Sequence, residues 1–206
     1  MAEQTASIWR PRDAWAGVAE KGQFGATGRS GVTAMLLGDM GFATLIAVPD
    51  SAGLDLATKR LIGLELPRTP SAVLSGTHGA IWAGPDQWLL VARQQPGFSD
   101  LLASLSADAA VSDQSHARAA LRVSGARVRE VLAKGSMVDL HPSVFPVGAA
   151  ALTRFAHMGV QLWRTGDGPD GAIFEILIAR SMAGSFWSWF AASAAEFGCC
   201  VTVGRD

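Results

Sequence analysis

AIWAGPDQWLLVA, at residues 80–92, and VQLWRTGDGPDGAIFEILIA, at residues 160–179, share one pattern that decides the fold. In each stretch an apolar run with a tryptophan meets a segment of Gly, Pro and Asp, and a second apolar run follows. Two strand-like runs parted by such a segment are typical of a β-hairpin. A helical pattern follows each hairpin, and an apolar–polar–Leu–x–Pro segment precedes it, GLELPRTP (63–70) or MVDLHPSVFP (137–146). We infer an internal duplication.

The elements around the two hairpins predict an α+β fold. Strands with helices packed on one face indicate two similar halves of split βαβ type, with antiparallel sheets. The runs TAMLL (33–37) and FATLIAV (42–48), parted by GDMG, indicate a further hairpin. Helical patterns are expected over residues 51–64, 96–107, 126–135 and 181–198, and further strands over residues 109–115, 117–125 and 151–159.

These elements divide the chain into three predicted parts. We expect an irregular segment over residues 1–32, a first α+β half over 33–112 and a second over 113–206. The two halves are expected to pack closely, as one domain or as two small ones. The glycines of GQFGATGRSG, residues 22–31, indicate a turning loop within the first part.

Composition excludes several classes of protein. The 206 residues are 49% hydrophobic and 17% charged, with a net charge of −1, so no basic footprint for nucleic acid or an anionic membrane is present. No signal-peptide pattern opens the chain, and no apolar run is long enough to span a membrane. The only cysteines, Cys199 and Cys200, are adjacent, which predicts free thiols and a reducing compartment. The expected location is the cytoplasm.

The last helix has the clearest pattern. Ser181 is expected to cap its start and Gly198 to end it. At 100° per residue, one arc of about 100° holds six residues. They are Met182, Phe186, Trp189, Phe190, Ser193 and Phe197. Trp187 lies outside this arc, which leaves two interpretations open: a place at the edge of the core, or contact with another subunit.

Three patterns invite a catalytic or metal-binding interpretation and fail it. Asp113, Ser115 and His116 are too close in sequence to converge as a triad, because neighbours on a strand alternate faces. The histidines, at positions 78, 116, 141 and 157, lack the spacing of a metal site. The GxGxxG spacing at residues 166–171 precedes a strand rather than a helix, so it predicts a hairpin loop.

The stretch KGSMVDLHPSVFP, residues 134–146, holds a lysine, an aspartate and a histidine. Lys134 would end a helix, where the dipole favours a cation. Val138, Leu140 and Val144 alternate like a short strand with Asp139 and His141 on the other face. This pattern explains the stretch without any catalysis.

The same stretch carries a resemblance to a known family. LAKG…DLHPSVFP, the helix opening RSMAGSFWSWF and GPDQWLLVA resemble the gamma subunit of heterotetrameric sarcosine oxidase, over about residues 30–198. The resemblance implies an aminomethyltransferase-like fold and partner subunits named alpha, beta and delta. It implies a complex that converts sarcosine to glycine with hydrogen peroxide, releasing formaldehyde or forming 5,10-methylenetetrahydrofolate. FAD, FMN, NAD, tetrahydrofolate and zinc are implied in the partner subunits, and no cofactor in this chain.

Relatives with this fold hold the pterin through a YTGExGxE motif, and here the matching region is RTGDGPDGAIFEI. The tyrosine is absent, Asp167 stands near the place of the first glutamate, and a longer loop leads to Glu175. A folate pocket would be lined by Glu175, Asp167 or Arg164, but Glu175 is expected to face solvent from its strand. The departures favour a chain that kept the fold and lost the site.

Two hypotheses follow. The first is a non-catalytic structural subunit of a sarcosine-oxidising complex, with no catalytic, cofactor-binding or metal-ligating residue of its own. The alternative is a free-standing folate-binding protein of one-carbon transfer.

Overall fold

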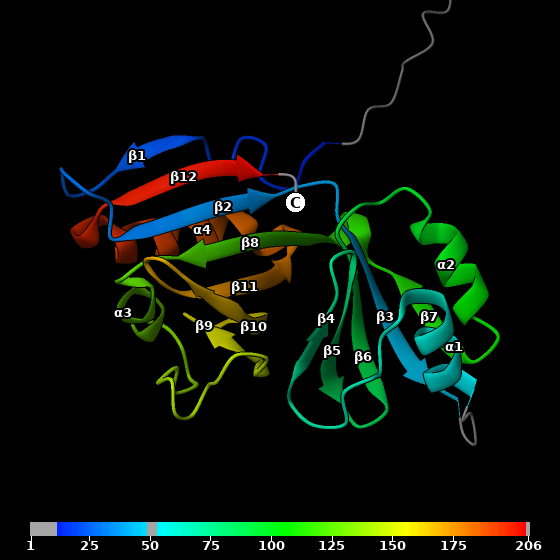
Figure 1. Ribbon diagram of the computed structural model, residues 1–206. Coiled ribbons are helices and arrows are strands. Elements are labelled where there is room, and N and C mark those ends of the chain that lie inside the picture. Colours follow the sequence, from blue (N-terminus) through cyan, green and yellow to red (C-terminus); the bar gives the residue numbers. More distant parts are fainter. Residues whose placement is uncertain (1–11, 49–52, 205–206) are drawn as a thin grey trace, which may run out of the picture.

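The computed structural model describes residues 12–48 and 53–204, which form two β-sheets with helices on their outer faces (Figure 1). A five-stranded sheet has the order β4-β5-β6-β3-β7. Its bounds are Gly41–Ala47 for β3, Ala72–Leu74 for β4, His78–Gly84 for β5, Gln87–Ala92 for β6 and Ala109–Asp113 for β7. Every pairing in this sheet is antiparallel.

A seven-stranded sheet has the order β1-β12-β2-β8-β11-β10-β9. Its bounds are Gly22–Phe24 for β1, Val32–Leu37 for β2, Arg118–Ser124 for β8, Ala150–Phe155 for β9, Met158–Gly168 for β10, Gly171–Ala179 for β11 and Cys199–Gly204 for β12. Only the pair of β12 and β2 is parallel among the described strands.

Four α-helices accompany the sheets in the part of the chain that the structure describes. They are α1 (Gly53–Ile62), α2 (Phe98–Leu105), α3 (Val128–Ala133) and α4 (Ala183–Ala194), and the short 3-10 helices are η1 (Ser115–Ala117), η2 (Arg180–Met182) and η3 (Ala195–Phe197). The predicted cap Ser51 lies outside the described residues. Among the helices of the described ranges, none has the length and apolar character that a membrane crossing needs.

The order of elements repeats. The chain runs β3-α1-β4-β5-β6-α2-β7 and then β8-α3-β9-β10-β11-α4-β12. The sheet orders correspond as well, because β9-β10-β11-β8 matches β4-β5-β6-β3, and β2 is inserted before β12. The α+β fold with two similar halves is therefore confirmed. The boundary proposed at residues 112 and 113 falls at the end of β7, whereas β2 pairs within the second sheet.

Alternation along β6 shows how the layers stack. Trp88 and Leu90 pack into a cluster with α1 and α2, whereas Leu89 and Val91 point to the other face. There they meet residues of the seven-stranded sheet, among them Trp163. Successive side chains of a strand point to opposite faces, so an apolar strand of this kind contributes side chains to two hydrophobic cores.

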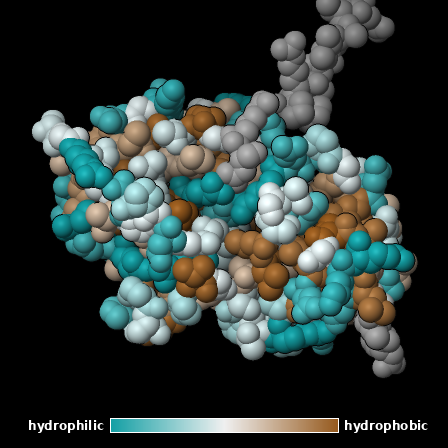
Figure 2. All heavy atoms as spheres, in the orientation of Figure 1, coloured by the Kyte–Doolittle hydropathy of each residue, from teal (hydrophilic) through white to brown (hydrophobic). Residues whose placement is uncertain are grey.

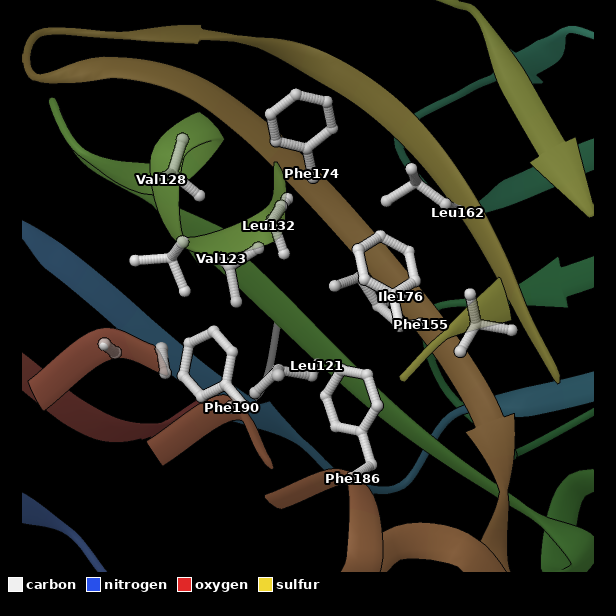
Figure 3. Packing of buried hydrophobic residues seen from close by; sticks show 14 of the residues in the cluster. Leu121, Val123, Val128, Leu132, Phe155, Leu162, Phe174, Ile176, Phe186 and Phe190 are labelled. Carbon is white, nitrogen blue, oxygen red and sulfur yellow. The ribbon is translucent and has the colours of Figure 1, made fainter. Parts of the chain in front are cut away.

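The largest core lies between the seven-stranded sheet and its helices. Figure 3 shows Leu121 and Val123 of β8 with Phe174 and Ile176 of β11, together with the aromatic rings of Phe186 and Phe190 of α4 in the lower part of the view. Phe186 and Phe190 of α4 are fully buried there and stack with ring centroids 6.3 Å apart. Burial of apolar area of this kind is the main stabilising term of a fold.

The hairpin predicted over residues 33–48 is wrong. β2 and β3 belong to different sheets, and the connection Gly38–Met40 carries the chain from one sheet to the other. Asp39 adopts a positive φ of 56°, and Gln95 binds the carbonyls of Asp39 and Met40. Two apolar runs beside a short turn give the same sequence pattern whether the two strands pair or diverge. The packing of the two strand faces decides which of these arrangements forms.

The irregular segment predicted over residues 1–32 is wrong for part of its length. β1 pairs with β12, and Trp15 is 2% exposed, with its indole N–H donating to the Ala120 carbonyl at 2.8 Å. The turning loop is present after β1, since Gly25 and Gly28 have positive φ. The buried tryptophan anchors a segment that lacks regular periodicity.

The sequence pattern predicted the end of the last helix but not its start. Ser181 does not cap α4, because Ser181 lies within the 3-10 turn η2, which precedes α4. The N-cap residue is Met182, whose side chain forms no capping hydrogen bond. Gly198 ends the helical segment with φ of 68°. Of the predicted arc, Phe186, Phe190 and Ser193 are buried, Trp189 and Phe197 half-buried and Met182 exposed.

Trp187 lies at the edge of the core. Its ring contacts Trp15 at 6.1 Å, Phe24 at 6.2 Å and Phe190 at 5.7 Å between centroids. The core-edge interpretation is therefore confirmed, and the covering residues come from the N-terminal segment of the same chain. Contact of Trp187 with another subunit stays a prediction.

The two cysteines are free thiols. Cys199 is buried, and burial raises the pKa of its thiol to about 12, with the neighbouring Cys200 adding to the shift. A thiol with so high a pKa stays protonated at neutral pH and is a poor nucleophile.

Replacement of Gly198 by alanine should lower the free energy of unfolding by about 2 kcal/mol. The glycine has a positive φ, and an added Cβ would lie 2.7 Å from the Ala26 carbonyl oxygen. Chemical denaturation of the purified chain measures the loss. Gly184→Ala is the matched control, because an added Cβ there would have no described atom within 4 Å outside the helix's own backbone and the neighbouring residues. We expect this variant to be neutral or slightly stabilising.

Candidate functional site: a buried carboxylate between the sheets

Glu175 lies on β11, between β8 and β10 in the seven-stranded sheet, and is 1% exposed. Its register partners are Trp163 on β10 and Arg122 on β8. Leu177, two residues along, packs against the five-stranded sheet, so Glu175 faces the space between the sheets. The expectation of a solvent-facing glutamate is wrong, because β11 is covered on one face by helices and on the other by a second sheet.

Two arginines neutralise this carboxylate. Arg93 Nη1 donates to Glu175 Oε1 at 2.7 Å, and Arg122 donates to the same oxygen through Nη2 at 2.7 Å and Nε at 3.1 Å. Arg93 directly follows β6, whereas Arg122 and Glu175 belong to the other sheet. The cluster of Arg93, Arg122 and Glu175, here called the ionic cluster, therefore joins the two halves. Ion pairs this far from water are shielded little by solvent.

Two polar atoms at the ionic cluster have no hydrogen-bond partner among the residues that the structure describes. They are Glu175 Oε2 and the indole Nε1 of Trp163, both buried. Because Trp163 and Glu175 are direct register partners on neighbouring strands, an acceptor and a donor are left close together on one face. A buried water or a polar ligand group commonly satisfies such atoms.

Asp167 belongs to a separate pair. Its carboxylate accepts from Arg164 Nη2 at 2.6 Å, and its side chain is 55% exposed. Arg164 is buried and also donates to the Phe145 carbonyl at 3.0 Å. The structure thus brings Arg164 and Asp167 together but binds Glu175 to other arginines, so the three predicted pocket residues do not form one site.

Several polar residues of the loop 134–146 form hydrogen bonds with one another. The short strand expected over residues 138–144 is wrong, because the segment is a series of turns: the Asp139 carboxylate accepts from the His141 N–H at 2.8 Å, and His141 Nδ1 lies 2.7 Å from Ser143 Oγ. Leu140 and Phe145 are buried, which fixes the loop. Asx turns of this kind compete with strand pairing.

Lys134 has a structural role. It is the C-cap residue of α3, and its ammonium donates to the Ser193 carbonyl at 2.6 Å and to the Glu196 carboxylate. It also lies 4.8 Å from the centroid of the Phe197 ring. Lys134 therefore joins α3 to the end of α4.

The Asp113, Ser115 and His116 segment is not built as a triad. Ser115 Oγ donates directly to the Asp113 carboxylate at 2.6 Å, whereas a triad needs the histidine between these groups. His116 lies in the 3-10 turn η1 rather than on a strand. The pair closes the turn between β7 and β8.

Gly166 to Gly171 form the end of the β10–β11 hairpin, as predicted, and Asp170 at its tip pairs with Arg29. Within residues 12–48 and 53–204, no group of three or more His, Cys, Asp or Glu side chains is placed to hold a metal ion. Sequence reasoning missed Arg93 and Arg122. A single cation within or directly after an apolar strand, as in RAALRVS and QWLLVAR, was the available signal.

Comparison with known proteins gives one consistent result. The model of the sarcosine oxidase gamma subunit family matches residues 48–196. The sarcosine oxidase subunit gamma of Arthrobacter sp. is 37% identical over 141 residues, which are 65% of this chain and 69% of the relative. A chain of the heterotetrameric sarcosine oxidase from Corynebacterium sp. U-96, solved in complex with pyrrole 2-carboxylate, superposes with a TM-score of 0.76 at 29% identity, covering 90% of this chain and 95% of that one.

A more distant match shows the fold alone. Glycine cleavage system aminomethyltransferase T from Bartonella henselae superposes with a TM-score of 0.59 at 13% identity, covering 84% of this chain and 48% of that one. The aminomethyltransferase-like fold is therefore confirmed. On the family match and the similarity to gamma subunits, the chain belongs to the sarcosine oxidase gamma subunit family.

Proposed function

We propose that this chain is a non-catalytic structural subunit of a cytoplasmic assembly that oxidises sarcosine, with alpha, beta and delta subunits as its partners. The observation that carries the proposal is the ionic cluster. The carboxylate best placed to hold a pterin, Glu175, is 1% exposed and is bound by Arg93 and Arg122 of its own chain. A carboxylate bound in this way links the halves of the chain rather than receiving a ligand.

The surface supports an assembly role. Aliphatic side chains lie exposed on several elements, and Figure 2 shows brown residues grouped on one face, near its centre and over the half that carries α1 and α2. The exposed large apolar residues are Ile46, Val48, Leu56, Leu61, Met137, Val144, Val147, Leu152, Met182 and Val203. Grouped apolar residues on a surface favour burial against a partner. FAD, FMN, NAD, tetrahydrofolate and zinc are proposed for the partner subunits.

Copurification tests the proposal. The tagged chain, isolated from its native cells, should bring down flavin-containing proteins, and the eluate should oxidise sarcosine and absorb in the visible range. The chain alone should be colourless and inactive. Elution of the chain without partners would contradict the assembly role.

The alternative function, a free-standing folate-binding protein of one-carbon transfer, draws support from the unpaired atoms beside the ionic cluster. Glu175 Oε2 and Trp163 Nε1 offer an acceptor and a donor to a ligand. Titration of the isolated chain with tetrahydrofolate, followed by tryptophan fluorescence, distinguishes the two functions. We expect no saturable binding. Saturable binding that Glu175→Gln abolishes, in a variant that stays folded, would support the alternative instead.

A further inference from the structure

We propose that a pocket at the junction of the two sheets, lined by Arg12, Arg118 and Arg180, binds a small oxyanion that carries a carboxylate or phosphate group. The pocket has a volume of about 300 Å³. None of these three arginines belongs to the ionic cluster of Arg93, Arg122 and Glu175.

The fold places this pocket where the chain passes between its halves. Both connections line it: Gly38–Met40, which leads from β2 to β3, and η1, which leads from β7 to β8. The turn at residues 12–14, Arg180 of η2 and the end of β12 complete the wall. Figure 1 shows these crossings between the two sheets. Clefts where two parts of a chain meet are preferred places for ligands.

The three guanidinium groups have neutral acceptors. Arg118 Nε donates to the Gln114 side-chain oxygen at 2.9 Å, and Arg12 Nη2 donates to the Ala16 carbonyl at 3.0 Å. Arg180 Nη2 donates to the backbone carbonyls of Arg12 and Asp13. Within the described ranges, none of these three arginines forms a salt bridge.

The charge of the pocket is positive. Among the described residues that line the pocket, three guanidinium groups stand against the two carboxylates of Asp13 and Asp39, so these side chains together carry one net positive charge. Asp13 Oδ1 accepts from the Trp15 N–H at 2.7 Å. Burial lowers the pKa of Arg118, because its cation is partly removed from water. A bound anion would offset this loss of hydration through its attraction to the guanidinium group.

The chemistry and the size of the pocket define the ligand class. A guanidinium group offers a planar fork of donors that matches the two oxygens of a carboxylate or phosphate. The volume of about 300 Å³ is at the small end of ligand pockets, so it suits a small anion and excludes a dinucleotide. Ser115 and Gln95 are neutral residues that also line the wall.

Calorimetric titration of the full chain with sodium phosphate and with sodium acetate, at constant ionic strength, tests the site. We expect saturable binding of at least one probe, and the tighter of the two identifies the group that the site prefers. Arg118→Gln should weaken binding by about tenfold or more, because a hydrogen bond to a charged group is lost. Arg60→Gln removes the same charge from an exposed position on α1 and should leave the affinity unchanged.

Chemical labelling tests the site without a variant that has to fold. Phenylglyoxal modifies accessible arginines, and the better-binding probe should protect Arg118 and Arg180 in the unaltered chain while Arg60 is labelled as before. Two results would overturn the site: no saturable binding of either probe, or equal weakening by Arg118→Gln and Arg60→Gln. Protection that does not distinguish Arg118 from Arg60 would overturn it as well.

Discussion

Glu175→Gln should lower the free energy of unfolding by about 3–5 kcal/mol. The substitution keeps the shape of the side chain but removes its charge, so Arg93 and Arg122 would remain as two cations with side chains only 12% and 25% exposed. Removing one partner of a buried ion pair costs more than the pair itself contributes, because the pairing with this carboxylate no longer offsets the desolvation of the remaining charges. Urea denaturation followed by tryptophan fluorescence measures the loss.

Asp170→Asn is the matched control for this prediction. Asp170 pairs with Arg29 at the tip of the β10–β11 hairpin, where both side chains are more than half exposed. Exposed pairs of this kind contribute about 0–1 kcal/mol, so the control should hardly change stability. A loss for Glu175→Gln no larger than that of the control would show that the ionic cluster is not a buried charge centre.

The ionic cluster also connects the two halves of the chain. Arg93 stands at the end of the five-stranded sheet, and Glu175 belongs to the other sheet. The double variant Arg93→Gln, Glu175→Gln should therefore lose less stability than the sum of the single variants, because each single substitution already removes the contact between Arg93 and Glu175. Strict additivity of the two losses would contradict the contact across the sheets.

Trp187→Ala should lower the free energy of unfolding by about 3 kcal/mol, at the lower end of the range for core aromatics, because the side chain is only partly buried. Its ring lies against Trp15 and Phe24, so the loss should also loosen the N-terminal segment from α4. Urea denaturation measures the stability, and limited proteolysis should show faster cleavage near residues 16–25.

Trp187→Phe is the control for this second prediction. It keeps an aromatic ring against Phe190 and should lose less stability than the alanine variant. An opposite result is equally informative. If Trp187→Ala leaves the isolated chain as stable as before but abolishes copurification with flavin-containing partners, Trp187 contacts a partner subunit rather than its own N-terminal segment.

Local patterns in the sequence determined much of this fold. Periodicity and turn chemistry, which act over a few residues, predict the two hairpins at residues 80–92 and 160–179, the helices after them and the repeated order of elements. Gly198 ends the last helix as predicted, because a residue with φ of 68° favours glycine. Family membership was also visible in the sequence, through the motifs of residues 134–146 and 180–190.

Only the tertiary structure decided how these elements face one another. The runs at residues 33–37 and 42–48 read as a hairpin but enter different sheets, and a strand glutamate that was expected in solvent lies between those sheets at 1% exposure. In both cases the outcome depends on what covers the second face of a strand. Residues distant in sequence supply that cover: Arg93 reaches Glu175 across 82 positions. Periodicity reports which side chains share a face, whereas the partner of each face is set by long-range packing.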